Sequence, residues 1–309
     1  MDAPLGATEI VAEAEAEGLR LDQFLCRLVP TLGRATARRV IEAGQVRVNG
    51  RAGAAGQRLS AGDVLDLAPE LELAGEPIAA LPDPAVPLIL RHEDAWLLCA
   101  DKPAGMPSHP LRPGELGTLA SALLARFPEL AAVGYSPREP GIVHRLDTDT
   151  SGLMLAARDA ETFALLRGQL DRAELDKRYL ALCAGRVGRA ATHTAHLSAR
   201  GPRVRVESAA FGSSEPIVTE ILETERAGDF TLVTVRVHRA RRHQIRAHLA
   251  QLGHPIAGDA LYGGPPLPGL ARHFLHAEEI HFTHPRTRAA LSLLSPLPVE
   301  LERALQSLR

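Results

Sequence analysis

A proline-rich segment divides this 309-residue chain into a short first part and a long second part. Four prolines fall within the twelve residues from Glu76 to Pro87 (EPIAALPDPAVP). Because proline fixes its own φ and has no amide N–H, such a run interrupts helices and central strands and favours an extended chain. We therefore predict a linker over residues 69–87, a small domain over residues 19–68 and one large domain over residues 88–309.

The first part has the pattern of a small α+β domain. Four apolar residues at the spacing i, i+3, i+4, i+7 indicate a helix that begins at Leu21, and Gly44 ends a second, shorter helical segment. The dipeptide Asn49-Gly50 favours a tight hairpin turn between strands. Together these signals predict helices over residues 21–28 and 34–43 and strands over residues 45–48 and 63–67.

The second part mixes short apolar strands with occasional helices and lacks a regular alternation of the two. This pattern predicts an α+β fold and argues against a doubly wound parallel sheet. The predicted strands are residues 88–90, 96–100, 179–183 and 231–237, and the predicted helices are residues 118–126 and 159–170.

The charges are strongly segregated along the chain, although the net charge is only −2. Residues 19–58 carry eight arginines and two acids, a local charge of +6, and the stretch from Arg236 to His248 has five arginines, three histidines and no acid. Two basic islands on a neutral background predict contact with the phosphates of a nucleic acid, although a charged run can also be an ordinary solvated surface. Residues 1–18, with five acids and no Lys or Arg, are predicted to be an acidic extension.

Several other classes of protein lack the signals that they require. No apolar stretch approaches the roughly 18 residues of a membrane span, and the acidic start differs from a signal peptide, so we expect a cytoplasmic protein. The three cysteines lie far apart and form no CxxC pair, and the three histidines of the second basic island are spaced by five without a carboxylate pattern. We therefore predict no metal site, and by default a monomer.

A polar loop between two apolar segments carries the most specific signal. The string HRLDTDTSGL at His144–Leu153 consists partly of ordinary turn-forming residues, but its order resembles the catalytic motif of the RluA-type RNA pseudouridine synthases. Further segments resemble motifs of the same family in the same order, and residues 19–63 resemble the RNA-binding domain named after ribosomal protein S-four. These further segments are DKPAGMPSHP at residues 101–110, GTL at 117–119, KRY at 177–179, RRHQIR at 241–246 and GDALYG at 258–263.

The resemblance implies a fold, an activity and a set of site residues. The fold would be an α+β catalytic domain on a mixed, mostly antiparallel sheet, preceded by the small α+β RNA-binding domain. The activity would be the isomerisation of specific uridines to pseudouridine without a cofactor. The implied catalytic residues are Asp147 as nucleophile, Arg246 as its cationic partner and Tyr179 against the target base. The expected RNA contacts are Arg145, Lys177, Arg241, His243, Lys102, Arg34, Arg38, Arg39 and Arg47.

The two lysines and Arg145 also have a physical rationale that does not depend on the resemblance. Only two of the 35 Lys and Arg residues are lysines, so Lys102 and Lys177 mark places where a compact ammonium is needed. We interpret Lys177 as a partner of a phosphate or carboxylate, because nothing in the sequence indicates a burial that would lower its pKa. An enzyme that acts on a uridine in a helix must flip it out, and Arg145 could fill the space that the uridine leaves.

The sequence departs from the family pattern at one point and leaves other functions open. Arg239-Ala240 stands where the family usually has Thr-Gly, and a missing glycine would forbid a positive φ there. Large-subunit ribosomal RNA is the predicted substrate, with transfer RNA as the alternative. A non-catalytic RNA-binding or ribosome-assembly factor, and a hydrolase that uses Asp147 and Asp149 as a carboxylate pair, are the other hypotheses.

Overall fold

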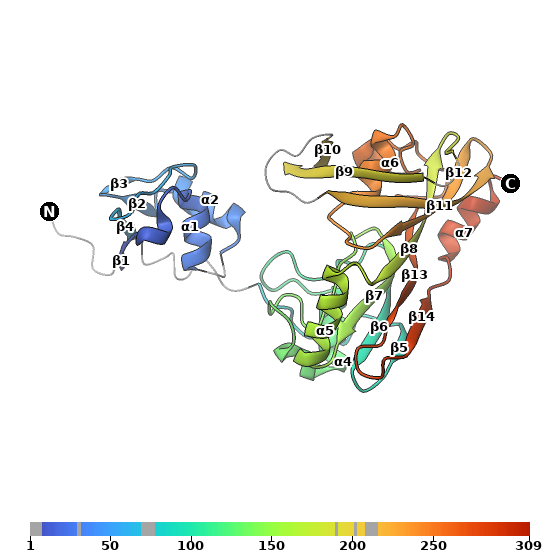
Figure 1. Ribbon diagram of the computed structural model, residues 1–309, viewed down its shortest axis with the longest axis horizontal. Coiled ribbons are helices and arrows are strands. Elements are labelled where there is room, and N and C mark those ends of the chain that lie inside the picture. Colours follow the sequence, from blue (N-terminus) through green and yellow to red (C-terminus); the bar gives the residue numbers. More distant parts are fainter. Residues whose placement is uncertain (1–7, 30–31, 69–77, 189–190, 201–202, 208–215) are drawn as a thin grey trace. The chain divides into compact units, whose positions relative to one another are not determined.

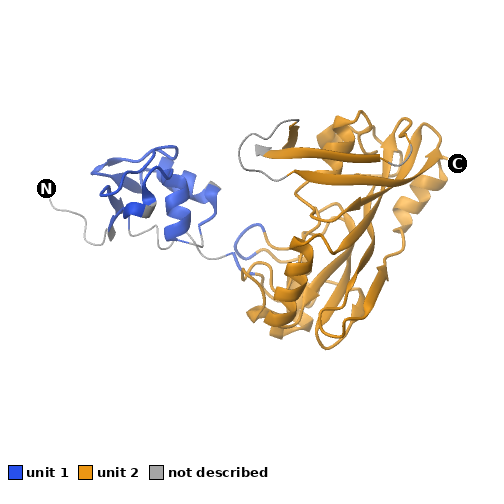
Figure 2. Cartoon of the chain, in the orientation of Figure 1, with its two compact units in different colours: residues 1–79, 111–114 blue, residues 80–110, 115–309 orange. Residues whose placement is uncertain are grey.

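The computed structural model describes residues 8–29, 32–68, 78–188, 191–200, 203–207 and 216–309. The chain forms two compact units, which Figure 2 distinguishes by colour. The first contains residues 1–79 and 111–114, and the second contains residues 80–110 and 115–309. Each unit has its own hydrophobic core, and the chain passes from the first unit to the second after residue 79, within the predicted linker.

The small unit is a four-stranded antiparallel sheet that packs against two helices (Figure 1). The strands follow the order β1-β4-β2-β3, and Leu21, Leu25 and Ile41 of the helices pack against Val46 and Leu65 of the sheet. Its elements are β1 (Thr8–Val11), α1 (Leu21–Leu28), α2 (Arg34–Glu42), β2 (Val46–Val48), β3 (Arg51–Ala52) and β4 (Val64–Leu67). The predicted helices and strands are confirmed to within two residues.

The hairpin turn forms for the reason that its sequence suggests. Asn49 and Gly50 both have positive φ values, 51° and 74°, as a tight turn between β2 and β3 requires. The Asn49 side chain also donates to Asp63 Oδ1 at 2.8 Å and accepts from the Val64 amide at 2.8 Å. The turn is thereby joined to the start of β4.

The structure corrects both ends of the predicted small domain. Residues 8–11 form β1 and pair with β4, and Ala12 and Ala16 are buried in the core, so the prediction of an acidic extension is wrong from Thr8 onward. The described acids Glu13 and Glu17 are exposed, which explains why the charge of this segment hid its apolar face.

At the other end of the small domain, Ala80 is buried in the large unit and its amide donates to the Pro137 carbonyl at 2.9 Å, so the predicted linker does not extend to Pro87. Residues 69–77 lie outside the described residues.

The large unit is built on one long sheet with the order β10-β9-β11-β12-β8-β13-β7-β6-β5, and β14 pairs with β13 (Figure 1). Among the described strands, β13 and β7 pair in parallel and the other pairs are antiparallel. This confirms a mixed, mostly antiparallel α+β fold. The strands are β5 (Leu90–Glu93), β6 (Leu97–Lys102), β7 (Ser151–Ala157), β8 (Asp176–Ala184), β9 (Ala191–Arg200), β10 (Arg203–Glu207), β11 (Ile217–Ala227), β12 (Phe230–Val237), β13 (Leu275–Thr283) and β14 (Ala290–Leu294).

Both faces of the central strands are buried, which explains their continuous apolar runs. In β7, Met154 and Ala156 face one core, whereas Leu153 and Leu155 face a second core together with Phe163 of α5. The helices are α4 (Leu119–Arg126), α5 (Ala160–Asp171), α6 (Gln244–Gln251) and α7 (Val299–Gln306), with short 3₁₀ turns at Pro128–Ala132 and Ala260–Tyr262. The two predicted helices, residues 118–126 and 159–170, are α4 and α5, each beginning one residue later behind an N-cap, Thr118 or Asp159. The strand predicted at residues 88–90 lies two residues later in the structure, where β5 begins at Leu90.

Candidate active site

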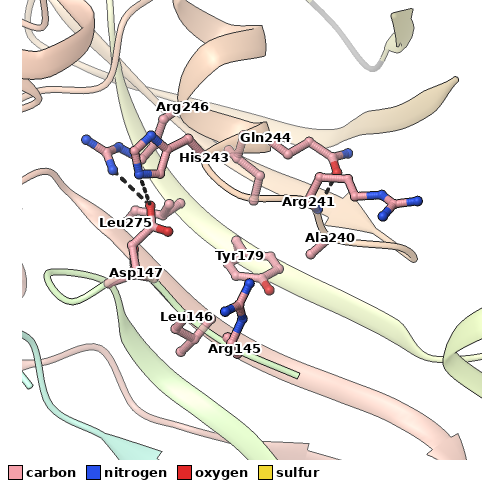
Figure 3. Close-up of a pocket in the computed structure, with 12 residues that line it drawn as sticks. Arg145, Leu146, Asp147, Tyr179, Ala240, Arg241, His243, Gln244, Arg246 and Leu275 are labelled. Carbon is pink, nitrogen blue, oxygen red and sulfur yellow. Dashed lines mark hydrogen bonds and ion pairs between the residues drawn. The ribbon is translucent and has the colours of Figure 1, made fainter. Parts of the chain in front are cut away.

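A pocket lies where the loop before β7, strand β8 and the start of α6 meet (Figure 3). Six of the residues predicted from the sequence line it. They are Arg145, Asp147, Tyr179, Arg241, His243 and Arg246. Asp149 is not among the twelve lining residues, so the loop presents one carboxylate to the pocket and not two.

Arg246 connects two carboxylates that are far apart in the sequence. Its Nη1 donates to Asp147 Oδ2 at 2.8 Å, while its Nε and Nη2 donate to the two oxygens of Asp259 at 2.7 and 2.8 Å. The Arg246 and Asp259 side chains are 8% and 1% exposed, so this second pair is buried, whereas the Asp147 side chain is 24% exposed. Burial opposes the charge on Arg246, but its hydrogen bonds to Asp259 and Asp147 raise its pKa. The fixed guanidinium therefore holds Oδ2 of Asp147 in one orientation.

The loop that carries Asp147 is held through its backbone. Lys102 Nζ donates to the carbonyl oxygens of Pro103, Met106 and Thr148 at 2.8, 2.8 and 2.9 Å. Arg272 donates to the Asp149 carbonyl at 3.1 Å. Lys102 is fully buried, and burial lowers its pKa to about 7. The expectation that Lys102 contacts RNA is therefore wrong: its amino group joins the backbone of the segment after β6 to the backbone of the loop that carries Asp147.

Gly152 fixes where this loop joins the sheet. It has φ = +115°, and a Cβ atom at this position would lie 2.1 Å from the carbonyl oxygen of Ala277. Residue 152 is paired with Ala277 where β7 and β13 run in parallel. Only glycine allows this close approach, which places the loop against the start of β13.

Tyr179 lies on the central strand β8, and its side chain is almost completely buried at the floor of the pocket. Burial raises the pKa of its hydroxyl, and the negative charge of Asp147 adds to this effect. The hydroxyl is therefore protonated at neutral pH, so it can donate a hydrogen bond or relay a proton but does not act as a phenolate.

His243 and Tyr262 form one wall of the site. His243 has φ = 55° and is the N-cap of α6; its Nδ1 lies 3.0 Å from the Tyr262 hydroxyl. Its Nε2 is 3.8 Å from Asp147 Oδ2, which is too long for a direct hydrogen bond. Burial lowers the pKa of His243, so the ring is neutral at pH 7. The left-handed residue of this turn is His243 and not Ala240, so Ala240 stands without conformational strain where the family has glycine.

Lys177 contradicts its sequence-based interpretation. Its side chain is 1% exposed, its Nζ has no hydrogen-bond partner among the described residues, and burial lowers its pKa to about 7. It cannot reach RNA from this position. Lys177 lies on β8 inside the sheet, between β12 and β13, and the positive charge of Arg167 on α5 adds to the effect of burial on its pKa. The local sequence gave no sign of this.

The arginines of the small unit differ in their surroundings. Asp22 is fully buried, and Arg20, Arg34 and Arg38 approach it at 3.0, 3.5 and 3.0 Å. The bond from Arg20 lowers the pKa of Asp22 to about 2 against the effect of burial, and Arg38 and Arg34 contribute as well. All four of the predicted arginines are exposed, but Arg34 and Arg38 pair with the buried Asp22 and so stabilise the fold of this unit, whereas Arg39 and Arg47 do not contact Asp22.

Asp259 and Tyr262 are site residues that the sequence analysis did not assign. Both lie in the GDALYG segment, which was noted as a motif without a role for any of its residues. Tyr262 also accepts from the amide of Val204 on β10 at 2.9 Å, so it joins that strand to the site.

Within the described part of the chain, no group of three His, Cys, Asp or Glu side chains is arranged to bind a metal ion. No described helix is long and apolar enough to cross a membrane.

Comparisons with known proteins agree with this architecture. The family model described as RNA pseudouridylate synthase matches residues 96–251, and the S4 domain model matches residues 19–65. An uncharacterized RNA pseudouridine synthase of Chloroflexus aurantiacus is 39% identical over 293 residues, which cover 94% of this chain and 90% of that protein. Ribosomal large subunit pseudouridine synthase D of Xanthomonas campestris is 35% identical over 314 residues, which cover 97% and 92%.

A solved structure shares the fold. Human RNA pseudouridylate synthase domain containing 1 superposes with a TM-score of 0.54 and 22% identity, over 74% of this chain and 96% of that one. The fold and the matched regions define an isomerase that acts on RNA. The chain belongs to the RNA pseudouridine synthase family, in its RluA-like branch, and carries an S4 domain at its amino-terminal end.

Proposed function

We propose that this enzyme converts uridine to pseudouridine in large-subunit ribosomal RNA, with Asp147 as the nucleophile. Two observations support the substrate: the name of the relative from Xanthomonas campestris and the S4 domain, whose exposed Arg39 and Arg47 can contact phosphates. A ribosomal substrate also agrees with the expected cytoplasmic location.

The observation that carries the assignment of the nucleophile is the arrangement Asp147–Arg246–Asp259. Asp147 lines the pocket and is partly exposed, while the guanidinium that pairs with it is buried and fixed from behind by two bonds to Asp259. Arg246 and His243 both approach Oδ2 of Asp147, and we assign the attack to Oδ1. A carboxylate that its neighbours hold in one orientation is suited to nucleophilic catalysis.

The reaction is an isomerisation, so every atom of the uridine is retained. Asp147 attacks the sugar or the base ring, the bond from uracil N1 to the ribose breaks, the base turns, and a bond forms from C5 to the ribose. The C5 hydrogen then leaves as a proton, N1 gains one, and Asp147 is released. Tyr179 supports the base with its ring, and its protonated hydroxyl can relay the C5 proton.

Arg145 is suited to the exchange of the uridine between helix and pocket. It lines the pocket, two residues before Asp147, and its side chain is 53% exposed. We propose that it fills the space left by the flipped uridine and so offsets the lost stacking. Arg241, which is exposed at the same rim, is placed to contact a flanking phosphate.

The release of tritium from uridine labelled at C5 tests this proposal. We would compare wild type, Asp147→Asn and the matched control Asp149→Asn, with unmodified ribosomal RNA and transfer RNA as substrates. We expect wild type and Asp149→Asn to release tritium from ribosomal RNA. We expect Asp147→Asn to bind the RNA but to release no tritium. Release from transfer RNA alone would change the substrate, turnover by Asp147→Asn would reject the nucleophile, and loss of turnover in both variants would favour a carboxylate pair. No release by wild type from either RNA would favour a binding role.

A further inference from the structure

Arg145 belongs to a cluster of charged and polar side chains that the proposed reaction does not use. Arg145 Nη1 lies 3.3 Å from Glu139 Oε1 and 3.0 Å from His109 Nε2. His109 Nε2 is itself 3.0 Å from the same Glu139 oxygen. The His109 side chain is 5% exposed and that of Glu139 is 32% exposed, so a rigid imidazole supports a carboxylate that solvent can reach.

The contacts of His109 determine which of these neighbours binds Arg145. Arg138 Nε, which can only donate, lies 2.9 Å from His109 Nδ1, closer than the carbonyl oxygen of Pro110 at 3.1 Å. With Nδ1 as an acceptor, the proton of a neutral ring is on Nε2, where it is donated to Glu139. Arg145 then meets a donor in His109 and an acceptor in Glu139, so the carboxylate alone holds its guanidinium.

We propose that Glu139, oriented by His109, is a positioning residue that holds Arg145 at the rim of the pocket and neutralises its charge until RNA displaces it. This inference rests on the role of Arg145 given in the proposed function. While Arg145 is paired, its positive charge does not add to non-specific attraction for phosphates. The pair is long and half exposed, so RNA can compete for the guanidinium.

The salt dependence of binding to an RNA without uridine measures this masking directly. For single-stranded RNA, each neutralised phosphate contributes about 0.7 to the slope of log affinity against log salt. In Glu139→Gln the carbonyl oxygen remains but the negative charge is lost, so Arg145 becomes free to contact a phosphate. With poly(C) as the probe, we expect a slope steeper by about 0.7 and an affinity about two- to fivefold higher at low salt.

Two controls separate the release of Arg145 from a general change in charge. Glu129→Gln removes a carboxylate that pairs with Arg158 at 2.7 Å, outside the pocket, and should leave the slope unchanged. In an Arg145→Ala background, Glu139→Gln should add nothing. An unchanged slope in Glu139→Gln, or the same increase in the Arg145→Ala background, would overturn the proposal. The assay uses no turnover, so a failure to release tritium would reject the proposed function separately.

Discussion

Asp259→Asn tests whether the carboxylate behind Arg246 is needed to keep the catalytic pair in place. In the wild type, both oxygens of Asp259 accept from Arg246, at 2.7 and 2.8 Å. An asparagine of the same shape can accept only one of these bonds, and its NH₂ group would face a guanidinium donor. The change therefore deprives Arg246 of its buried negative partner and of one of the two hydrogen bonds that orient it, without creating a cavity.

The expected cost follows from the burial of the pair. Removing one partner of a buried ion pair costs about 3–5 kcal/mol, because the other charge stays buried. Arg246 keeps Asp147 at 2.8 Å, so we expect the lower end of this range for the free energy of unfolding, about 3 kcal/mol. A displacement of about 1 Å in a catalytic group lowers rates by about 100-fold, and we expect a loss of that order in kcat/KM.

Urea unfolding and tritium release would be measured on the same preparations. Glu174→Gln is the matched control, because Glu174 binds Arg172 with the same two-bond geometry, at 2.6 and 2.9 Å, on the exposed surface. We expect no measurable change in that variant. The reasoning fails if Asp259→Asn unfolds at the wild-type urea concentration and keeps full turnover, or if the control is equally affected.

Three further outcomes follow from other parts of the structure. Lys177 has a pKa of about 7 in the fold and about 10.4 when unfolded, so the unfolded chain binds more protons between these values and stability rises with pH across that window. Lys177→Met should flatten this rise in urea titrations from pH 7 to 10 and raise stability near pH 7 by up to about 4 kcal/mol. Gly152→Ala should cost more than about 2 kcal/mol in thermal unfolding and lower turnover, because its Cβ would meet the Ala277 carbonyl. Changing Arg39 and Arg47 to Gln should lower the slope of log affinity for RNA against log salt, and an unchanged slope would mean that this surface of the small unit does not contact RNA. Arg38→Gln should instead destabilise the small unit, because Arg38 pairs with the buried Asp22.

Much of the secondary structure could be predicted from local pattern alone. The apolar spacing of α1, the Asn49-Gly50 turn and the capped starts of α4 and α5 depend on residues within a few positions of one another. The strand β1 was missed because the residues that follow it alternate exposed acids, Glu13 and Glu17, with the small buried residues Ala12 and Ala16, so the composition of the whole segment resembled a solvated extension.

The site was predicted to a different depth. The order of its motifs pointed to Asp147, Tyr179 and Arg246, and the structure brings these three to one pocket. The role of Asp259 could not be predicted, because it lies thirteen positions after Arg246 in the sequence and only the turn after α6 returns it to that side chain.

By itself, the sequence determined the helices and turns, the basic islands and the motif that carries the proposed nucleophile, because each is a property of neighbouring residues. Only the tertiary structure decided which charged side chains are available to contact RNA. Two lysines that looked like RNA contacts are buried, and two arginines of the small unit are paired with a buried Asp22. Burial and charge pairing depend on which strands and helices pack together across long separations in the chain, and those contacts exist only once the sheet has formed.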